Sequence, residues 1–264
     1  MIDERQVALA RMTSPEAAEA LANAEVALIP VGATEQHGPN MTLETDTAVA
    51  YQLALRTAAA LHPRAVVSPP LPYGVSYHHM GFPGTMTLSP ETFQAVVLEV
   101  VESLRQHGVG RFFIIDGHAG NQGALDVLMT KLRFQMGVRA AYLFYFTIVD
   151  DLMREGAKAE RWGHACEVET SMGLALQPDI VRDEALEKGK LRSTSLPYSN
   201  VLKTPRVGVP LSFEEITENG ALGDARQASE EFGQELTNAV VTRSVEFLER
   251  FLGEWRTDDG RDNC

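Results

Sequence analysis

Short apolar runs alternate along the chain with longer segments whose apolar residues recur at helical spacing. Each run is apolar almost throughout, rather than at every second position, and this predicts strands that are buried on both faces. Strand–helix alternation of this kind is typical of a mostly parallel sheet with helices on both sides. The sequence therefore predicts a three-layer α/β fold. The four runs are Val26–Val31, Ala65–Ser68, Arg111–Ile115 and Arg139–Phe146.

Capping residues mark where the helices between these strands begin. Ser14 and Ser89 each precede a proline, a pair that favours the first turn of a helix. Thr45 is the expected N-cap of a helix that begins at Asp46. The predicted helices are Ser14–Asn23, Asp46–Ala60, Ser89–His107, Asn121–Met136, Glu167–Leu176 and Arg226–Leu252.

Two segments carry no clear periodic pattern. They are Gly189–Ser212 and the tail after Trp255, and residues 257–264 are expected to be frayed. With 264 residues, 44% of them hydrophobic, the chain is long enough for one large domain or two small ones. Because no repeat, linker or composition shift divides it, we expect a single domain over residues 1–256.

Acidic residues outnumber basic ones. Asp and Glu number 36 against 23 Lys and Arg, which gives a formal net charge of −13. Nucleic acid and anionic membrane require a basic face, so we expect neither as a partner; solubility is the ordinary reason for such an excess. The N-terminus has no apolar signal region, and no apolar run approaches the length of a membrane span. The two cysteines, Cys166 and Cys264, do not suggest a disulfide framework, and we expect a cytoplasmic protein.

Residues of metal-ligating type gather directly after the first predicted strand. Glu35 and His37 lie in the following loop, and Asp46 lies in the first turn of the next helix. The loop contains no lysine or arginine to neutralise the acids. Three such ligands could hold one divalent metal ion, and a bridging carboxylate could hold two. The ordinary alternative is a solvated turn with a surface ion pair.

A second cluster, Asp116–Asn121, follows the third predicted strand. Ligands of parallel sheets collect at the carboxyl ends of the strands, so His118 is expected at the same edge as the first cluster. The glycines around His118 permit close backbone approach, and the amides before the next helix could face a developing negative charge. We interpret His118 as a metal ligand; a capping or surface imidazole is the alternative. A phosphate loop is disfavoured because its lysine and spacing are missing.

The third cluster contains His164, Cys166, Glu167 and Glu169. In a helix, His164 and Glu167 would share a face, as one metal ligand and one general acid or base. Glu169 would point elsewhere, into packing or a hydrogen bond behind the site. An exposed ion pair is the alternative, although the neighbouring residues are small and apolar. Cys166 is a candidate nucleophile, but free cysteines are more often buried and inert, and no His–Asn partner set accompanies it.

Together the clusters resemble the creatininase (creatinine amidohydrolase) family. The resemblance rests on three motifs: Gly32–Gly38 with Asp46, Asp116–Asn121, and Gly163–Ser171. It runs from about Val26 to Gly223, and the segments Tyr73–His79 and Phe82–Thr85 resemble the substrate-side loop of the family. The resemblance implies a two-metal hydrolase on an α/β fold, most often with zinc and otherwise with manganese or iron, that assembles as a hexamer.

The resemblance also implies which residues hold the metals. Glu35, Asp46 and His118 would hold one ion, and His37 with Asp46 the other, so that Asp46 bridges. Two divalent ions would lower the pKa of a bridging water, and the resulting hydroxide would attack a carbonyl carbon polarised by one metal.

One position departs from creatininase itself. There, a glutamate two residues after the histidine that corresponds to His118 completes the second site, whereas this chain has Gly120. Many family members instead recruit a glutamate from a His-Ala-x-Glu-x-Glu motif. The resemblance therefore assigns Glu167 to the second metal, with Glu169 as the fallback.

The remaining roles concern catalysis and substrate contact. His164 is the candidate that passes a proton to the leaving group, and Asn121 with nearby amides would hold the tetrahedral oxyanion. Plain packing is the alternative for each residue on the expected substrate-side surface. These residues are Tyr73, Tyr77, His78, His79 and Trp162.

A small cyclic amide is the favoured substrate, by family analogy. The missing glutamate at Gly120 argues against a creatininase proper. A cyclic ketone or lactone fits the same hydroxide chemistry, and a peptide or formamide is a further family alternative. From a different class, a metal-dependent isomerase or a metal-binding protein without catalysis would carry the same ligands.

Overall fold

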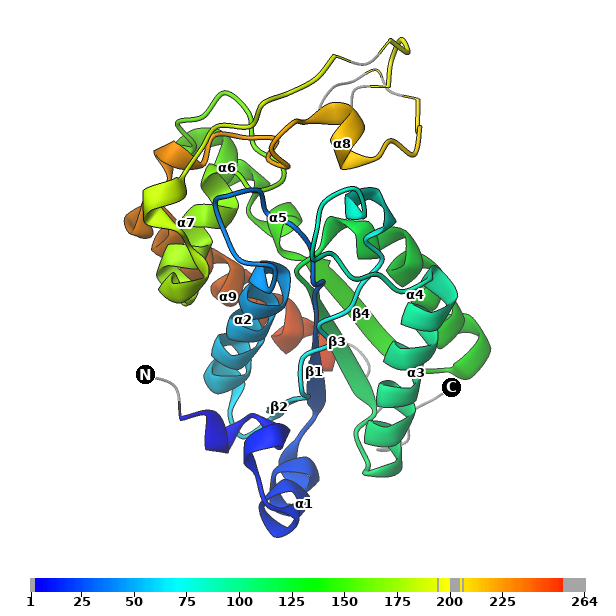
Figure 1. The fold of residues 1–264 in the computed structure, drawn as a ribbon. Helices are drawn as coiled ribbons and strands as arrows, with labels where there is room; N and C mark the ends of the chain where they lie inside the picture. Colours follow the sequence, from blue (N-terminus) through cyan, green and yellow to red (C-terminus); the bar gives the residue numbers. More distant parts are fainter. Residues whose placement is uncertain (1–2, 194, 200–204, 206, 254–264) are drawn as a thin grey trace.

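Four parallel strands form the central sheet (Figure 1). The structure is a computed structural model, and it describes residues 3–193, 195–199, 205 and 207–253. The strand order is β2-β1-β3-β4, and each neighbouring pair is parallel, which confirms the predicted sheet. The strands are β1 (Val26–Val31), β2 (Ala65–Val67), β3 (Arg111–Asp116) and β4 (Arg139–Phe144).

Helices cover both faces of the sheet and complete the three layers (Figure 1). One apolar core lies between the sheet and α2, α7 and α9, and the other lies between the sheet and α3 and α4. Along β1, Val26 and Leu28 belong to the first core, whereas Ala27, Ile29 and Val31 belong to the second, which explains the continuous apolar run. The helices are α1 (Ser14–Asn23), α2 (Thr45–Leu61), α3 (Pro90–Gln106), α4 (Gln122–Met136), α5 (Tyr145–Ile148), α6 (Asp150–Gly156), α7 (Glu167–Leu176), α8 (Phe213–Ile216) and α9 (Glu230–Gly253).

Some element boundaries differ from the prediction for local reasons. Thr45 is the first residue of α2 rather than its cap. β4 ends at Phe144 because Tyr145 already begins α5. The last helix begins at Glu230, since Arg226 belongs to a separate 3-10 turn. Helices α5, α6 and α8 have 4, 7 and 4 residues, too few to show helical periodicity in the sequence.

The weakly patterned segments contribute little regular structure. The described residues between Gly189 and Ser212 form no helix and no strand of the sheet. The tail 257–264 and Trp255 lie outside the described residues. In the part of the chain that the structure covers, no helix combines the length and the apolar character of a membrane span.

The carboxyl ends of the central strands meet at one edge of the sheet. Val31 and Asp116, the last residues of β1 and β3, are directly paired, and the amide of Gly117 donates to the carbonyl of Val31 at 2.8 Å. The chain after β2 returns to the same place, because the amide of Gly32 donates to the carbonyl of Leu71 at 2.9 Å. The loops after three strands therefore leave the sheet side by side.

Candidate metal centre

The first acidic and imidazole cluster converges at this edge. Glu35 and His37 lie in the loop between β1 and α2, and Asp46 lies in the first turn of α2. All three side chains are buried. Oδ1 of Asp46 lies 3.1 Å from Nε2 of His37. The loop thus folds back so that its ligand-type atoms face the start of the helix.

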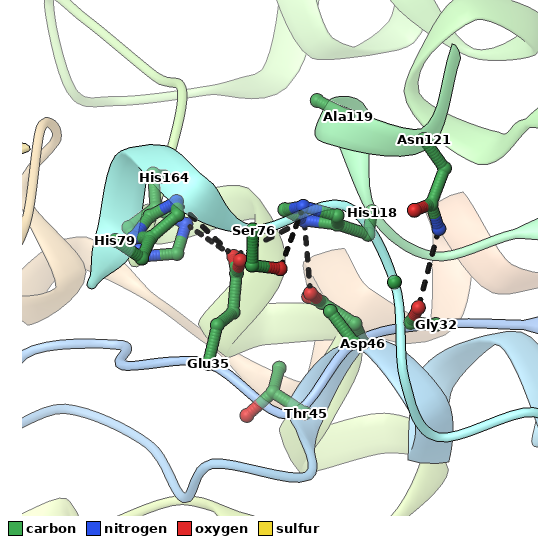
Figure 2. Close-up of polar contacts among 12 residues, drawn as sticks. Gly32, Glu35, Thr45, Asp46, Ser76, His79, His118, Ala119, Asn121 and His164 are labelled. Atoms are coloured by element: carbon green, nitrogen blue, oxygen red, sulfur yellow. Dashed lines mark hydrogen bonds and ion pairs between the residues drawn. The ribbon is translucent and has the colours of Figure 1, made fainter. Parts of the chain in front are cut away.

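His118 reaches the cluster from the loop after β3 (Figure 2). Its Nδ1 lies 3.2 Å from Oε1 of Glu35 and 3.2 Å from Oδ2 of Asp46. Its Nε2 lies 3.1 Å from both the hydroxyl of Ser76 and the carbonyl oxygen of Val75. Because a carbonyl only accepts, Nε2 carries a proton there, and Nδ1 is left to face the carboxylates. Metal-ligating histidines are commonly held by such a hydrogen bond on the other ring nitrogen.

His164 comes from the turn before α7 rather than from the helix itself. Its Nδ1 lies 3.6 Å from Oε1 of Glu35, and its Nε2 lies 2.6 Å from the carbonyl oxygen of Gln36. The next residue, Ala165, has a φ of +51°, a left-handed conformation that non-glycine residues rarely adopt. The carboxylate of Glu169 accepts a hydrogen bond from the Ala165 amide and so holds this turn.

These side chains form overlapping groups of ligand type. In the described part of the chain, four sets of three side chains have ligand atoms that lie within 4.8 Å of one another. The sets share members, so they make up one continuous cluster. They are Glu35–His37–Asp46, Glu35–His78–His118, Glu35–His79–His164 and His37–His164–Glu169.

Three carboxyl groups lie close together in this buried space. Glu35, Asp46 and Glu169 are all buried, and burial raises the pKa of Glu169 to about 7 and also raises the pKa of Glu35. Burial acts to lower the pKa of His37, but the carboxylate of Asp46 outweighs it and raises that pKa to about 9. A divalent cation would balance charges that are otherwise costly to bury.

Several atoms of the cluster lack the hydrogen bonds that buried polar atoms ordinarily make. Oε2 of Glu35, Nε2 of His37 and Oδ2 of Asp46 have no hydrogen-bond partner in the described structure, although ion-pair partners lie near the last two. Carboxylate oxygens and imidazole nitrogens are ligands of zinc and manganese. The donor set therefore fits divalent metal ions.

A cavity of about 630 Å³ opens onto this cluster. Its polar part includes Glu35, Asp46, His118, His164 and Glu169. A large apolar part of its lining comes from the end of β4, the start of α5 and the segment around α8, which lies above this edge of the sheet in Figure 1. We call the following residues the apolar wall: Phe144, Phe146, Val209, Pro210, Leu211, Phe213, Ile216 and Leu222.

A family model described as creatininase, creatinine amidohydrolase, matches residues 10–248. The chain belongs to the creatininase family. Together with the cluster of metal-ligating side chains, this membership makes it a metal-dependent hydrolase of the amidohydrolase type.

Relatives in the creatininase family carry different activities. A mycofactocin precursor peptide peptidase of Mycolicibacterium smegmatis is 30% identical over 235 residues, which cover 88% of this chain and 85% of the relative. A 3-dehydro-scyllo-inosose hydrolase of Thermotoga maritima is 30% identical over 259 residues, covering 91% and 81%. A creatinine amidohydrolase of Pseudomonas putida is 29% identical over 235 residues, covering 82% and 85%.

Solved creatininase-family structures share the fold. A putative creatinine amidohydrolase from Bacteroides fragilis superposes with a TM-score of 0.85 at 23% identity, covering 94% of this chain and 97% of that one. A creatininase variant of Zn–Zn type has a TM-score of 0.75 at 26% identity, with coverage of 93% and 98%. A manganese form of creatininase has a TM-score of 0.69 at 26% identity, with coverage of 93% and 99%.

The structure places Glu167 outside the ligand sets, contrary to the sequence-based assignment. Its carboxylate accepts hydrogen bonds from the amides of Lys158 at 2.9 Å and Ala159 at 2.6 Å. The expected shared face with His164 is not formed, because α7 begins only at Glu167. The fallback residue, Glu169, is the one that lies in the cluster.

Gly120, the position at which the resemblance implies a glutamate in creatininase itself, has no room for a side chain. A Cβ on Gly120 would lie 2.7 Å from Cε1 of His78 and closer still to Nε2 of His118 and the carbonyl of Val75. The close approach of these groups requires glycine. Position 120 therefore supplies no carboxylate to the cluster.

Asn121 ties loops together rather than facing the cavity, so the expected oxyanion contact is not formed. Its Oδ1 accepts from the amide of Val75 at 2.9 Å, and its Nδ2 donates to the carbonyl of Gly32 at 3.2 Å and to Oδ1 of Asp116 at 3.0 Å. The same Asp116 oxygen accepts from the amide of His118 at 3.0 Å. With both donors engaged, Asn121 holds the His118 loop in place and has none for a substrate.

The residues expected on the substrate side divide into two groups. Tyr77, His78 and His79 line the cavity. Tyr73 and Trp162 are not among the described residues that line it; Tyr73 is exposed, and Trp162 packs against the larger apolar core.

Cys166 is buried beside the site without facing it. Its Sγ lies 3.5 Å from the carbonyl oxygen of Gly163, and burial raises the pKa of the thiol to about 12. A thiol with this pKa remains protonated near neutral pH and is a poor nucleophile.

Two parts of the site were missing from the sequence-based prediction. Phe213 and its neighbours in the apolar wall come from a segment with little pattern, and α8 is too short to recognise. In the sequence, Gln36 lies between the candidate ligands Glu35 and His37, and this position was the one available signal that its side chain belongs to the site. Its side chain contacts the rings of His79 and His164.

Proposed function

We propose that this protein is a dinuclear metal-dependent hydrolase that cleaves the C–N bond of a small cyclic amide. The proposal rests above all on the unpartnered carboxylate and imidazole atoms that converge from separate loops beside one cavity. When bound, a pair of divalent ions supplies Lewis-acid polarisation and a water of lowered pKa. Zinc is our first choice, with manganese or iron as alternatives; creatininase relatives carry zinc or manganese.

In this proposal Asp46 would contribute a ligand to each of the two ions. Its Oδ2 lies 3.2 Å from Nδ1 of His118, which with Glu35 completes one site. Its Oδ1 lies 3.1 Å from Nε2 of His37, which belongs to the other. Glu169 would supply the second carboxylate of that other site, which its position within ligand range of His37 supports.

His164 transfers the proton to the leaving nitrogen. Its Nε2 donates to the carbonyl oxygen of Gln36 at 2.6 Å, a shorter contact than the 3.1 Å to the side-chain nitrogen of Gln36. Because the carbonyl can only accept, Nδ1 carries the lone pair and faces Glu35. Burial lowers the pKa of His164, so the ring is neutral near pH 7 and can take up a proton before it donates one.

Gln36 fixes the tautomer of His79. Its Oε1 accepts from the amide of Gly38 at 2.8 Å and its Nε2 donates to the carbonyl of Gly220 at 3.0 Å, so backbone groups set the orientation of the amide. The second hydrogen on Nε2 is directed to Nδ1 of His79 at 2.9 Å. Nε2 of His79 therefore carries the proton, and it lies 3.4 Å from Oε1 of Glu35. Two neighbouring imidazoles thus offer one donor and one acceptor to the same carboxylate.

The relatives favour more than one substrate class. A cyclic amide follows the family description and the creatinine amidohydrolase relative. The Thermotoga maritima relative favours a cyclic ketone as the substrate, and a lactone would be attacked by the same hydroxide chemistry. The peptidase relatives favour a peptide as the substrate. A formamide is a further family alternative. An isomerase or a metal-binding protein without catalysis is the alternative of a different class.

A mass-resolved screen of cyclic amides, lactones, cyclic ketones, formamides and short peptides separates these options. The protein is incubated with added zinc or manganese, and products are identified by mass. We expect a cyclic amide to gain the mass of one water. An isomerase would leave the mass unchanged, a binding protein would turn nothing over, and hydrolysis of another class alone would replace the cyclic-amide proposal.

We also propose that the protein is a cytoplasmic homo-oligomer, and a hexamer by family resemblance. Light scattering coupled to size-exclusion chromatography gives the mass in solution directly. A mass of one or two chains would contradict the hexamer without touching the proposed chemistry.

A further inference from the structure

The apolar wall occupies a large part of a cavity whose remaining lining is acidic and imidazole-rich. We propose that the substrate carries an uncharged apolar or aromatic substituent beside the scissile amide, and that the apolar wall binds this substituent. The inference rests on the proposed function and adds the chemical class of the group attached to the ring.

The apolar wall is built from packed side chains rather than from scattered ones. The rings of Phe144 and Phe146 stack with centroids 5.3 Å apart and an interplanar angle of 9°. Phe213, Ile216 and Leu222 form a small core of their own, with all three side chains buried. Such packing fixes the position of the surface that a ligand would meet.

The wall adjoins the candidate catalytic groups. The ring of Phe213 lies with its centroid 3.8 Å from that of His79 and 4.9 Å from that of His164. A substrate whose carbonyl carbon lies at the metal cluster can therefore place an adjacent substituent against the ring of Phe213. The cavity volume of about 630 Å³ falls within the range of roughly 300–1,000 Å³ that is typical of small-molecule sites, which leaves room for a ring and a substituent.

Charge decides which substituents fit. No lysine or arginine occurs among the described residues that line the cavity, whereas Glu35, Asp46 and Glu169 do line it. A carboxylate on the substrate would lose its hydration against the wall without gaining a cationic partner there. A polyhydroxylated ring would also leave hydroxyls unpaired where they face the apolar wall, because the side chains of the wall carry no hydrogen-bonding group. Ser212, the residue before α8, already donates its hydroxyl to Glu215 at 2.9 Å.

Matched ring amides test the inference by turnover. Hydantoin, 5-benzylhydantoin and 5-carboxymethylhydantoin share one ring and differ only in the substituent. We expect kcat/KM for the benzyl compound to exceed that for hydantoin by at least about tenfold, because apolar contact in a pocket discriminates by this much or more. The carboxymethyl compound is expected to be the poorest. Equal or better turnover of the carboxymethyl compound would overturn the inference and leave the hydrolase proposal standing.

Variants of the apolar wall test whether this surface causes the preference for the benzyl compound. Phe213→Ala should remove the preference for the benzyl group, and Leu211→Lys should shift the preference towards the carboxymethyl group. Val207→Ala is the matched control, because Val207 lies in the same segment, is 57% exposed and does not line the cavity. Benzyl preference that survives both wall variants would contradict the assignment of this surface.

Measuring the binding of hydroxamates tests the apolar site independently of whether the substrate is a cyclic amide. Acetohydroxamate, phenylacetohydroxamate and succinate monohydroxamate are titrated calorimetrically into the zinc-loaded protein. We expect Kd for the phenyl compound to be at least about tenfold lower than for the other two, with the difference lost in Phe213→Ala. This result without turnover of any hydantoin would retain the apolar site and reject the cyclic-amide substrate. Equal affinities, or no binding of the phenyl compound, would reject the apolar site.

Discussion

Oδ1 of Asp46 lies 3.1 Å from Nε2 of His37, and both side chains are buried. The other oxygen of the same carboxylate lies 3.2 Å from Nδ1 of His118, a residue from a different loop. One carboxylate therefore spans two imidazoles that reach it from separate strands. This relationship is the physical basis for the proposal that two metal ions share Asp46 as a ligand.

Asp46→Ala is expected to strip both metal ions, because the variant removes a ligand from each site. His37→Ala should weaken mainly one of them. Metal content after desalting, measured by plasma mass spectrometry, distinguishes the two outcomes. Equal and partial loss in both variants would contradict the bridging role of Asp46.

Glu169→Gln and Glu167→Gln form a matched pair on one helix. We expect Glu169→Gln to lose about one ion per chain, whereas Glu167→Gln keeps its metal. Glu167→Gln should instead lower the free energy of unfolding by about 1–3 kcal/mol, because the amide side chain can no longer accept from both backbone donors. Metal analysis and urea unfolding measure the two effects, and the reverse pattern would restore Glu167 as the ligand.

His164→Ala should retain its metal content while turnover of the substrate found by screening falls by about 10²–10⁴-fold, the usual contribution of a general acid or base. Tyr77→Phe, which changes a cavity residue without removing an imidazole, is the control for altered lining. Unchanged turnover in His164→Ala would remove the proposed proton-transfer role.

Gln36→Glu should change the tautomer of His79, because a carboxylate cannot donate to Nδ1. Ring ¹⁵N NMR of the histidines, with His79→Gln for assignment, is expected to show the proton on Nε2 in the original protein and a change only for rings that contact Gln36. Gln94→Glu, at a side chain that donates to the carbonyl of Ala124, is the control. A proton on Nδ1 of His79 in the unaltered protein would contradict the arrangement.

The strands and the edge of the sheet that carries the site were predictable because their physical signals are local. Burial on both faces makes β1 continuously apolar, as its division between two cores illustrates. Parallel strands then place the loops of Glu35 and His118 side by side, whatever the details of those loops.

Other features depend on long-range geometry that no local pattern records. The choice between Glu167 and Glu169 depends on where α7 begins and on the left-handed turn at Ala165. The role of Asn121 depends on loops that meet only in the folded chain. The part of the apolar wall around Phe213 could not be predicted because Phe213 belongs to a four-residue helix.

Metal content per chain tests the central claim most directly. The protein is purified without chelator, desalted, and analysed by plasma mass spectrometry against an independent protein concentration. If the cluster binds two cations, we expect close to two zinc, manganese or iron ions per chain. The contradicting result is one ion or none per chain, in protein that remains folded and does not bind added zinc or manganese. That result would contradict the paired site and the hydrolytic chemistry that depends on it.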